Sequence, residues 1–171
     1  MASELRVDKI VPVDGVPTGG GGGIIQVKST TITNTFTNDQ ETFADITGVT
    51  VTITPKFSTS KMLIMYNGCA SMEGTNRMGH VRIVRVVSGS TNSTIYVGDQ
   101  GESNQARASS SFASVYYYMM MPFGGTFMDS PATTNAVTYK LYQKRINGSG
   151  TPSVNRNSNN QTQMIAMEVS A

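Results

Sequence analysis

Five consecutive glycines at residues 19–23 divide the sequence into two parts of different character. Each glycine loses more backbone entropy on ordering than any other residue, so the run favours a flexible joint over a helix or strand. Before it lies a short, charge-bearing segment, and after it short apolar runs alternate with Gly, Ser, Asn and Thr. The sequence therefore predicts an N-terminal arm (1–18), a linker (19–23) and one domain (24–171), an organisation typical of a part that attaches to a larger assembly.

Strand signals dominate the domain. Val49, Val51 and Ile53 alternate with threonines, a period of two that places one apolar face inward. Similar alternation occurs at residues 25–28, 137–141 and 165–169, and continuous apolar runs occur at 62–66 and 115–121. Residues 81–87 begin by alternating and then break the alternation at Val86 and Val87, which indicates a bulge or a second covered face. Helical periodicity is lacking, so we expect about eight to ten short strands in an all-β antiparallel sandwich or barrel.

The two continuous runs, 62–66 and 115–121, are apolar on both faces of the predicted strand. In a small antiparallel domain one face of such a strand belongs to the core, and the other is usually covered by a second subunit. A core within a single chain is the alternative. We expect a subunit interface, formed in the second run by Tyr116, Tyr117, Tyr118, Met119 and Met120.

Composition excludes several partners. The formal net charge is +2 and charged residues make up 14% of the chain, which argues against nucleic acid or an anionic membrane as the partner. Arg82 and Arg85 lie close together inside an apolar run, either as charges on a strand face or as an anion contact. The longest apolar run, near residues 115–123, is far short of the ~18–20 residues of a membrane helix. Residues 1–18 have no apolar core of a signal peptide, so we expect synthesis in the host cytoplasm.

Candidates for chemistry are few. The glycine run lacks the Gly-Lys-Ser/Thr ending of a phosphate loop. His80 is the sole histidine and is expected on the surface or in a loop, while Cys69, the sole cysteine, is expected as a small buried hydrophobe. Asp45, Asp99 and Asp129 each lie within two residues of Gly, Ser or Thr, and aspartate in such places commonly caps a turn. We therefore expect no catalytic site, no metal and no cofactor.

The arm is unusually apolar for a solvated tail. Pro12 and Pro17 exclude a continuous helix, and an extended peptide can bind by joining a sheet edge or lying in a groove. We expect the arm to anchor the protein to a particle through Leu5, Val7, Ile10, Val11 and Val13.

Four stretches carry a resemblance to a known group of proteins. They are the opening Leu5-x-Val7-Asp8-x-Ile10, residues 52–61 (TITPKFSTSK), residues 129–134 (DSPATT) and the ending 165–168 (IAME). The chain resembles small virion proteins of tailed bacteriophages, common in phages of marine and cyanobacterial hosts. This resemblance implies a trimeric, jelly-roll-like knob on the virion, of the capsid decoration, head-fibre or tail-fibre type.

These observations together predict a non-catalytic virion surface protein: a homotrimer whose arm docks on capsid or tail proteins and whose knob projects outward. The alternative is a receptor-binding fibre tip that recognises a host-surface glycan, and an enzyme such as a glycan depolymerase comes third. Any outward recognition is expected in the polar loops at residues 73–79, 99–111 and 147–163, because their Asn, Ser, Gly and Gln side chains suit adaptable hydrogen bonding.

Overall fold

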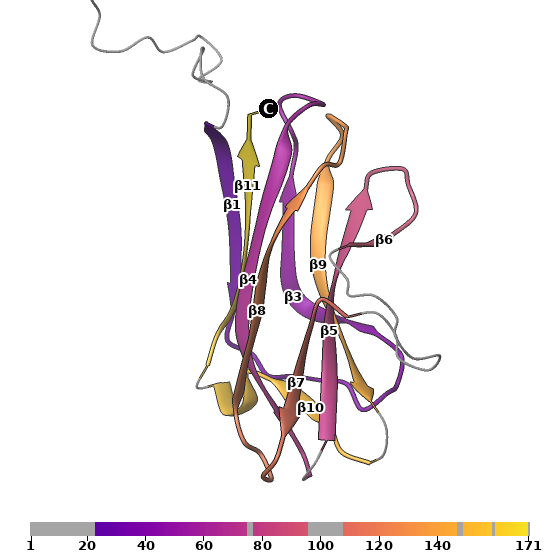
Figure 1. The fold of residues 1–171 in the computed structure, drawn as a ribbon, viewed down its shortest axis with the longest axis vertical. Coiled ribbons are helices and arrows are strands. Elements are labelled where there is room, and N and C mark those ends of the chain that lie inside the picture. The colour runs from indigo at the N-terminus through magenta and orange to yellow at the C-terminus, as the bar shows by residue number, and fades with distance from the viewer. Residues whose placement is uncertain (1–22, 75–76, 96–107, 147–148, 159, 171) are drawn as a thin grey trace, which may run out of the picture.

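The computed structural model describes residues 23–74, 77–95, 108–146, 149–158 and 160–170. They form two antiparallel sheets packed face to face, which confirms the predicted all-β sandwich (Figure 1). The predicted arm, with its anchoring residues, and the first four glycines of the linker lie outside the described residues. Gly23 immediately precedes the first strand.

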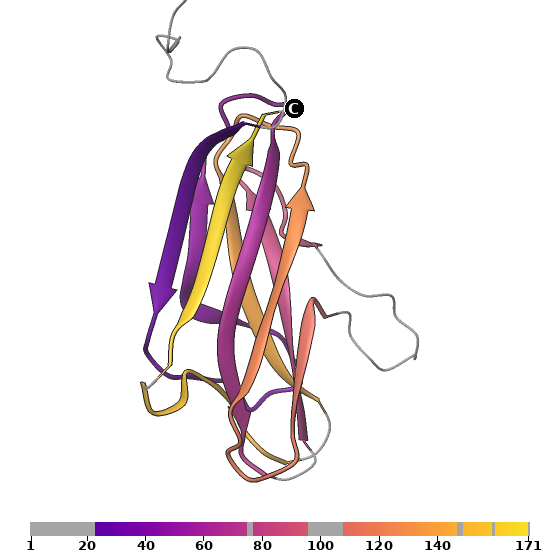
Figure 2. The ribbon, with the colours of Figure 1, turned by 60° about the vertical axis from the view of Figure 1, so that its left-hand side comes forward.

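Sheet A has six strands. Its central strand is β4 (Lys61–Met72), which pairs on one edge with β8 (Met121–Asp129). The other edge of β4 pairs with β11 (Thr162–Val169) and then with the short β10 (Pro152–Val154). Beyond these lie β1 (Ile24–Ile32), on β11, and β2 (Phe36–Thr37), on β10. Figure 2 shows β1, β11, β4 and β8 side by side in front, with the other sheet behind.

Sheet B has five strands. Strand β9 (Val137–Ile146) lies between β3 (Ala44–Ile53) and β5 (Arg77–Val87). The edge of β5 that faces away from β9 pairs with β7 (Ser110–Ser114) along its first half and with β6 (Ser93–Ile95) along its second half. A short 3₁₀ helix, Arg156–Ser158, separates β10 from β11. The register of β5 against β9 is continuous, so the break in alternation at Val86 and Val87 produces no bulge there.

The pairing is that of a jelly roll. Along the chain, β1 pairs with β11, β3 with β9, β4 with β8, and β5 with β7, so the strand pairs are nested as in one long folded hairpin. Lateral pairing of β4 with β11 and of β5 with β9 rolls this hairpin into two sheets. The resulting orders, β1-β11-β4-β8 and β3-β9-β5-β7, are those of the two-sheet jelly roll.

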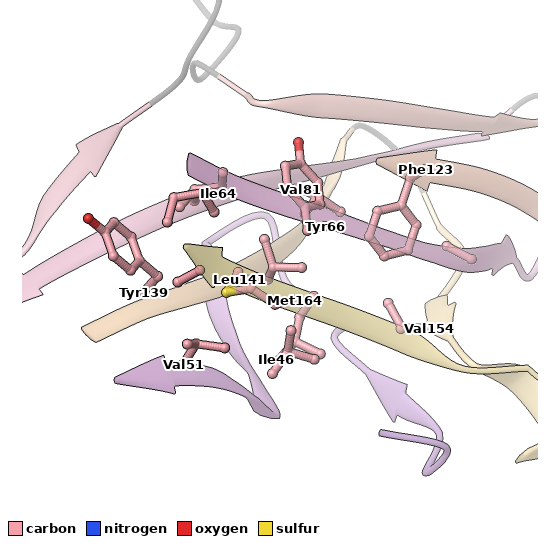
Figure 3. Packing of buried hydrophobic residues seen from close by; sticks show 14 of the residues in the cluster. Ile46, Val51, Ile64, Tyr66, Val81, Phe123, Tyr139, Leu141, Val154 and Met164 are labelled. Carbon is pink, nitrogen blue, oxygen red and sulfur yellow. The ribbon is translucent and has the colours of Figure 1, made fainter. Parts of the chain in front are cut away.

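The core lies between the sheets and follows the period of two. Val49, Val51 and Ile53 of β3 are buried, as their alternation with threonine predicts. Alternate residues of β4, β9 and β11 meet them from the other strands (Figure 3). The largest fully buried apolar side chains are Tyr139, Ile46, Ile53, Met62, Ile64, Met72, Ile83, Leu141 and Met164. Burial of this apolar surface, worth about 25 cal/mol per Å², holds the two sheets together.

The predicted strand at residues 115–121 is wrong. Strand β7 ends at Ser114 and β8 begins at Met121, so the intervening residues form the turn between them. Pro122 lies within β8 opposite Cys69. Proline is tolerated there because β8 is an edge strand, paired only with β4, and a missing N–H need not break a central ladder.

The last strand has an unexpected orientation. Met164, Ala166 and Glu168 of β11 point inward, and the larger apolar side chains of the strand face outward. Glu168 is fully buried, yet its carboxylate is well hydrogen-bonded: Oε1 accepts from the Lys56 and Phe57 amides at 2.7 and 3.3 Å, and Oε2 accepts from Gln26 Nε2 at 2.6 Å. These bonds fix the turn after β3 against both terminal strands.

Replacing Glu168 with glutamine tests this role. An amide has one acceptor oxygen in place of two, so a donor would then face either the backbone amides or Gln26. We expect Glu168→Gln to lower the free energy of unfolding by about 1–3 kcal/mol, measured by urea denaturation. Glu41→Gln is the matched control, because that side chain is 58% exposed and lies 3.7 Å from Arg145, where a change within about 0.5 kcal/mol is expected. Equal effects of the two substitutions would contradict this account of Glu168.

Candidate functional site

The sole histidine lies in a strand and not in a loop, which corrects the sequence prediction. His80 is in β5, is only 6% exposed, and its Nδ1 lies 2.7 Å from Ser111 Oγ on β7. Burial, followed by the nearby charge of Lys144, lowers the pKa of His80 to about 4. The imidazole is therefore neutral at neutral pH and held between neighbouring strands.

Two of the candidate aspartates form ion pairs and do not cap turns, also a correction. Asp129 is buried, with Oδ1 2.7 Å from Arg85 Nη1, and Oδ2 accepts from Tyr139 OH at 2.8 Å. Burial and the Asp129 charge raise the pKa of Tyr139, so its phenol stays protonated and donates. Asp45 pairs with Lys140 at 2.8 Å. Asp99 lies outside the described residues.

The other residues considered as candidates for chemistry also lie apart from one another. Arg82 and Arg85 lie on opposite faces of β5, so they do not form a joint anion contact. Cys69 is half-buried on β4, less enclosed than predicted. In the described part of the chain, His, Cys, Asp and Glu side chains nowhere gather in the threes that could hold a metal ion. No described helix has the length and apolar character needed to cross a membrane.

The residues predicted as a subunit interface form the β7–β8 turn. Tyr116 is 71% exposed, Tyr117 57% and Met119 40%, whereas Tyr118 and Met120 are half-buried. Because the segment is not a strand, its side chains do not alternate between two faces of a sheet. The turn lies at the end of the sandwich opposite the start of β1 and the end of β11 (Figures 1 and 2).

This tyrosine loop, residues 115–120, is held in a defined shape. The Tyr118 amide donates to Met72 O at 3.0 Å, and the Met119 amide donates to Tyr116 O at 3.2 Å. The buried Ser114 hydroxyl also donates to Tyr116 O. Tyr118 has a φ of 63°, a left-handed conformation that is a genuine outlier for a bulky side chain. Such strain persists only where surrounding contacts enforce it, and it is concentrated at functional sites.

Glu73, which follows β4, ties the loop to its neighbours. Its Oε1 accepts from Tyr117 OH at 3.0 Å and from Tyr118 OH at 3.2 Å. Hydrogen bonding to Tyr118 and Glu73 raises the pKa of Tyr117 to about 12, so this hydroxyl stays protonated at neutral pH. The Glu73 amide in turn donates to Thr151 O at 3.1 Å. One residue therefore links three segments that are distant in sequence.

These three segments enclose a pocket of about 410 Å³, lined by Glu73, Gly74, Arg77, Tyr117, Ser149, Gly150 and Thr151. Arg77 Nη2 lies 3.4 Å from Ser149 Oγ across it. Gly150 is required for the approach of the two backbones: its φ is +130°, and a Cβ there would lie 2.2 Å from Glu73 O. The pocket, which we call the tyrosine pocket, therefore combines an aromatic ring, a carboxylate and a guanidinium on a fixed backbone.

Arg156 completes the surroundings of the tyrosine loop. Its guanidinium carbon lies 2.9 Å from the centroid of the Tyr118 ring, whose neighbour Tyr117 is 4.0 Å away, centroid to centroid. Arg156 is positioned by Asn155, which is fully buried and has a φ of 51°. Asn155 donates its amide to Cys69 O and its side-chain Nδ2 to Ile32 O, both at 3.0 Å.

Apolar side chains form a patch on the outer face of sheet A, which also carries Lys61, Ser29 and Thr126. In one cross-strand row Val27, Met167, Leu63 and Met128 lie side by side from β1 to β8. Ile165 and Met65 occupy the next row, and Ile24 and Val169 the row toward the terminal end. Ile24 is 55% exposed, Val27 51%, Met128 44% and Met65 37%. We call this eight-residue surface the apolar face; contiguous exposed apolar patches often mark interaction sites.

The outer face of sheet B has a different character. Arg82 stacks on Phe43, with its guanidinium carbon 4.0 Å from the ring centroid, and Lys144 Nζ lies 5.4 Å from the same ring. Lys140 reaches Asp45 on the same side. Desolvation by burial lowers the pKa of both Arg82 and Lys144. The outer face of sheet B thus carries several charged side chains between its strands, whereas apolar side chains predominate in the patch on sheet A.

Sequence patterns located only part of this arrangement. The sequence predicts recognition by the polar loops 73–79, 99–111 and 147–163, and parts of the first and third line the tyrosine pocket. Residues 99–107 lie outside the described residues. However, Arg77 to Gly79 belong to β5, and the third range contains β10, the 3₁₀ helix and the start of β11. The meeting of Glu73 with Tyr117 depends on the β4–β8 pairing, for which the sequence carries no local signal.

No known protein family matches the sequence, and a search of curated proteins found no match either. Among solved structures, the chain is similar to one of infectious bursal disease virus strain Gx, with 13% identity and a TM-score of 0.37. The VP2 subviral particle of the same virus gives 11% identity and a TM-score of 0.36. The matches cover 86% and 85% of this chain but only 37% and 38% of the viral chains. At such TM-scores the likeness is no argument for a shared function.

Proposed function

We propose that this chain is a non-catalytic surface protein of a virion, assembled as a homotrimer. In this proposal residues 1–18 dock on capsid or tail proteins, residues 19–23 act as the joint, and the jelly roll projects outward as a knob. The observation that carries the proposal is the apolar face of sheet A. The trimeric state and the attachment to a virus particle are inferred from the resemblance of the sequence to tailed-phage virion proteins.

The apolar face suits contact between copies of the chain. All eight of its residues are apolar, and Val27 and Met128 are about half exposed in a single chain. Burying such side chains against another copy is favourable, at roughly 25 cal/mol per Å². Sheet B is the poorer choice for self-association, because a contact there would have to desolvate the charges of Arg82 and Lys144.

The geometry also suits tethering from one end. Strand β1 starts at Ile24, directly after Gly23, and Ile24 pairs with Val169 at the end of β11. The tyrosine loop lies at the opposite end, next to Met72. Strand β4 has 12 residues and runs from one end to the other. The distance from its first to its last residue is about 36 Å, at roughly 3.3 Å for each step between neighbouring residues. An arm bound to a particle would therefore hold the tyrosine loop away from it.

Replacing Met65 with aspartate tests the subunit contact. The substitution places a carboxylate within the apolar face, beside Ile165, and burying an unpaired carboxylate is costly. We expect the dissociation constant of the trimer to rise at least about 100-fold, equivalent to ~3 kcal/mol. Analytical ultracentrifugation of the full chain measures this against a parent mass of three times 18.3 kDa.

Met78→Asp is the matched control for this experiment. Met78 lies on β5 in sheet B and is 43% exposed, compared with 37% for Met65. We expect this variant to remain trimeric, and both variants to keep the parental circular dichroism spectrum. A monomeric parent protein, or a trimeric Met65→Asp variant, would disprove the contact.

Deleting residues 1–18 tests the anchor. Three arms of one trimer act together, so weak single contacts can give firm attachment through effective concentration. We expect the truncated protein to stay folded and trimeric but to bind particles lacking the native protein at least tenfold more weakly than the full chain. Co-sedimentation with those particles measures this.

In the full-length chain, Ile10→Asp should weaken particle binding in the same direction, whereas Ser3→Asp, which adds the same charge without removing an apolar side chain, should not. Undiminished binding by the truncated protein would mean that the knob itself docks, and the anchor role of the arm would have to be abandoned.

A further inference from the structure

We propose that the tyrosine pocket binds a neutral saccharide, with Tyr117 supplying an aromatic platform and Glu73 and Arg77 supplying hydrogen bonds. That the pocket faces away from a particle rests on the proposed function; the binding chemistry rests on the pocket alone. Its volume of about 410 Å³ falls in the usual range of ligand pockets, which is roughly 300–1,000 Å³.

The charges of the lining select the class of ligand. Glu73 disfavours an anion and Arg77 disfavours a cation, so an uncharged molecule avoids both penalties. The same two groups provide a strong acceptor and a strong donor, and Ser149 can act as either. A sugar hydroxyl both donates and accepts, which makes a polyol complementary to this set.

Tyr117 supplies the apolar part of the site. Its side chain is 57% exposed and lines the pocket. Tyrosine offers a large apolar ring with a polar tip at low conformational cost, which suits a ligand whose ring carries C–H groups on one side and hydroxyls at its edge. The bond from Tyr117 OH to Glu73 Oε1 fixes the ring beside the carboxylate.

The pocket is formed before any ligand arrives. The Tyr118 amide is bonded to Met72 O, and the Glu73 amide to Thr151 O, so the lining segments are joined by backbone hydrogen bonds. Binding to such a site requires little ordering of the protein, and this raises the affinity available from few contacts. The strained φ of Tyr118 is maintained by the same bonds.

The test measures saccharide binding by the full-length protein. The probe is an immobilised panel of neutral oligosaccharides built from glucose, galactose, mannose, rhamnose and N-acetylglucosamine, and several binding sites per assembly would strengthen weak single-site contacts on such a surface. Saturation-transfer NMR with the best-binding oligosaccharide then gives its dissociation constant for each variant. We expect at least one panel member to bind.

Three variants locate the binding. Tyr117→Ala, which removes the platform, and Glu73→Gln, which weakens the acceptor, should each raise the dissociation constant at least tenfold. Tyr116→Ala is the matched control, since Tyr116 belongs to the same turn and is 71% exposed but does not line the pocket. It should leave the dissociation constant within twofold. Thermal unfolding confirms that each variant is folded.

Absence of binding to every panel member at millimolar concentration would overturn the proposal, as would binding that Tyr117→Ala and Glu73→Gln leave unchanged. The result is separate from the proposed function. If the protein binds sugar but neither trimerises nor attaches to particles, the saccharide site is supported and the virion role is refuted. If it trimerises and attaches to particles but binds no sugar, the virion role is supported and the saccharide site is refuted.

Discussion

Hydrogen bonding on both edges of β4 is the constraint on which the rest of the structure depends. One edge of β4 holds β11, and through it β1, so the two ends of the domain meet beside Lys61. The other edge holds β8, which brings the tyrosine loop against Met72 and Glu73 at the far end. A single strand of about 36 Å thus separates the tethered end from the tyrosine pocket.

The buried Glu168 has a consequence for the outside of the molecule. By placing this carboxylate inward, where three donors satisfy it, β11 turns Ile165, Met167 and Val169 outward. These side chains complete the apolar face together with β1, β4 and β8. In the proposed trimer, a polar group in the core and an apolar surface outside are therefore two results of one strand register.

Sequence patterns predicted the fold better than they predicted the site. The alternation of Val49, Val51 and Ile53 located β3 correctly, because a strand with one buried face leaves a period of two in the sequence. The same reasoning failed at residues 115–121, where valine and tyrosine favour a strand by propensity but the chain turns through a positive φ at Tyr118. The tyrosine pocket depends on contacts between segments about 40 and 75 residues apart, for which no local pattern exists.

The most direct test of the account is methionine oxidation of the full-length protein at assembling concentration. Met65 and Met128 are 37% and 44% exposed in a single chain, and Met78 and Met119 are 43% and 40% exposed. Their oxidation rates should therefore differ only where another subunit covers them. If copies of the chain meet through the apolar face, mass spectrometry will show Met65 and Met128 protected several-fold relative to Met78 and Met119. Equal oxidation of all four methionines would show that this face is open to solvent and contradict the account.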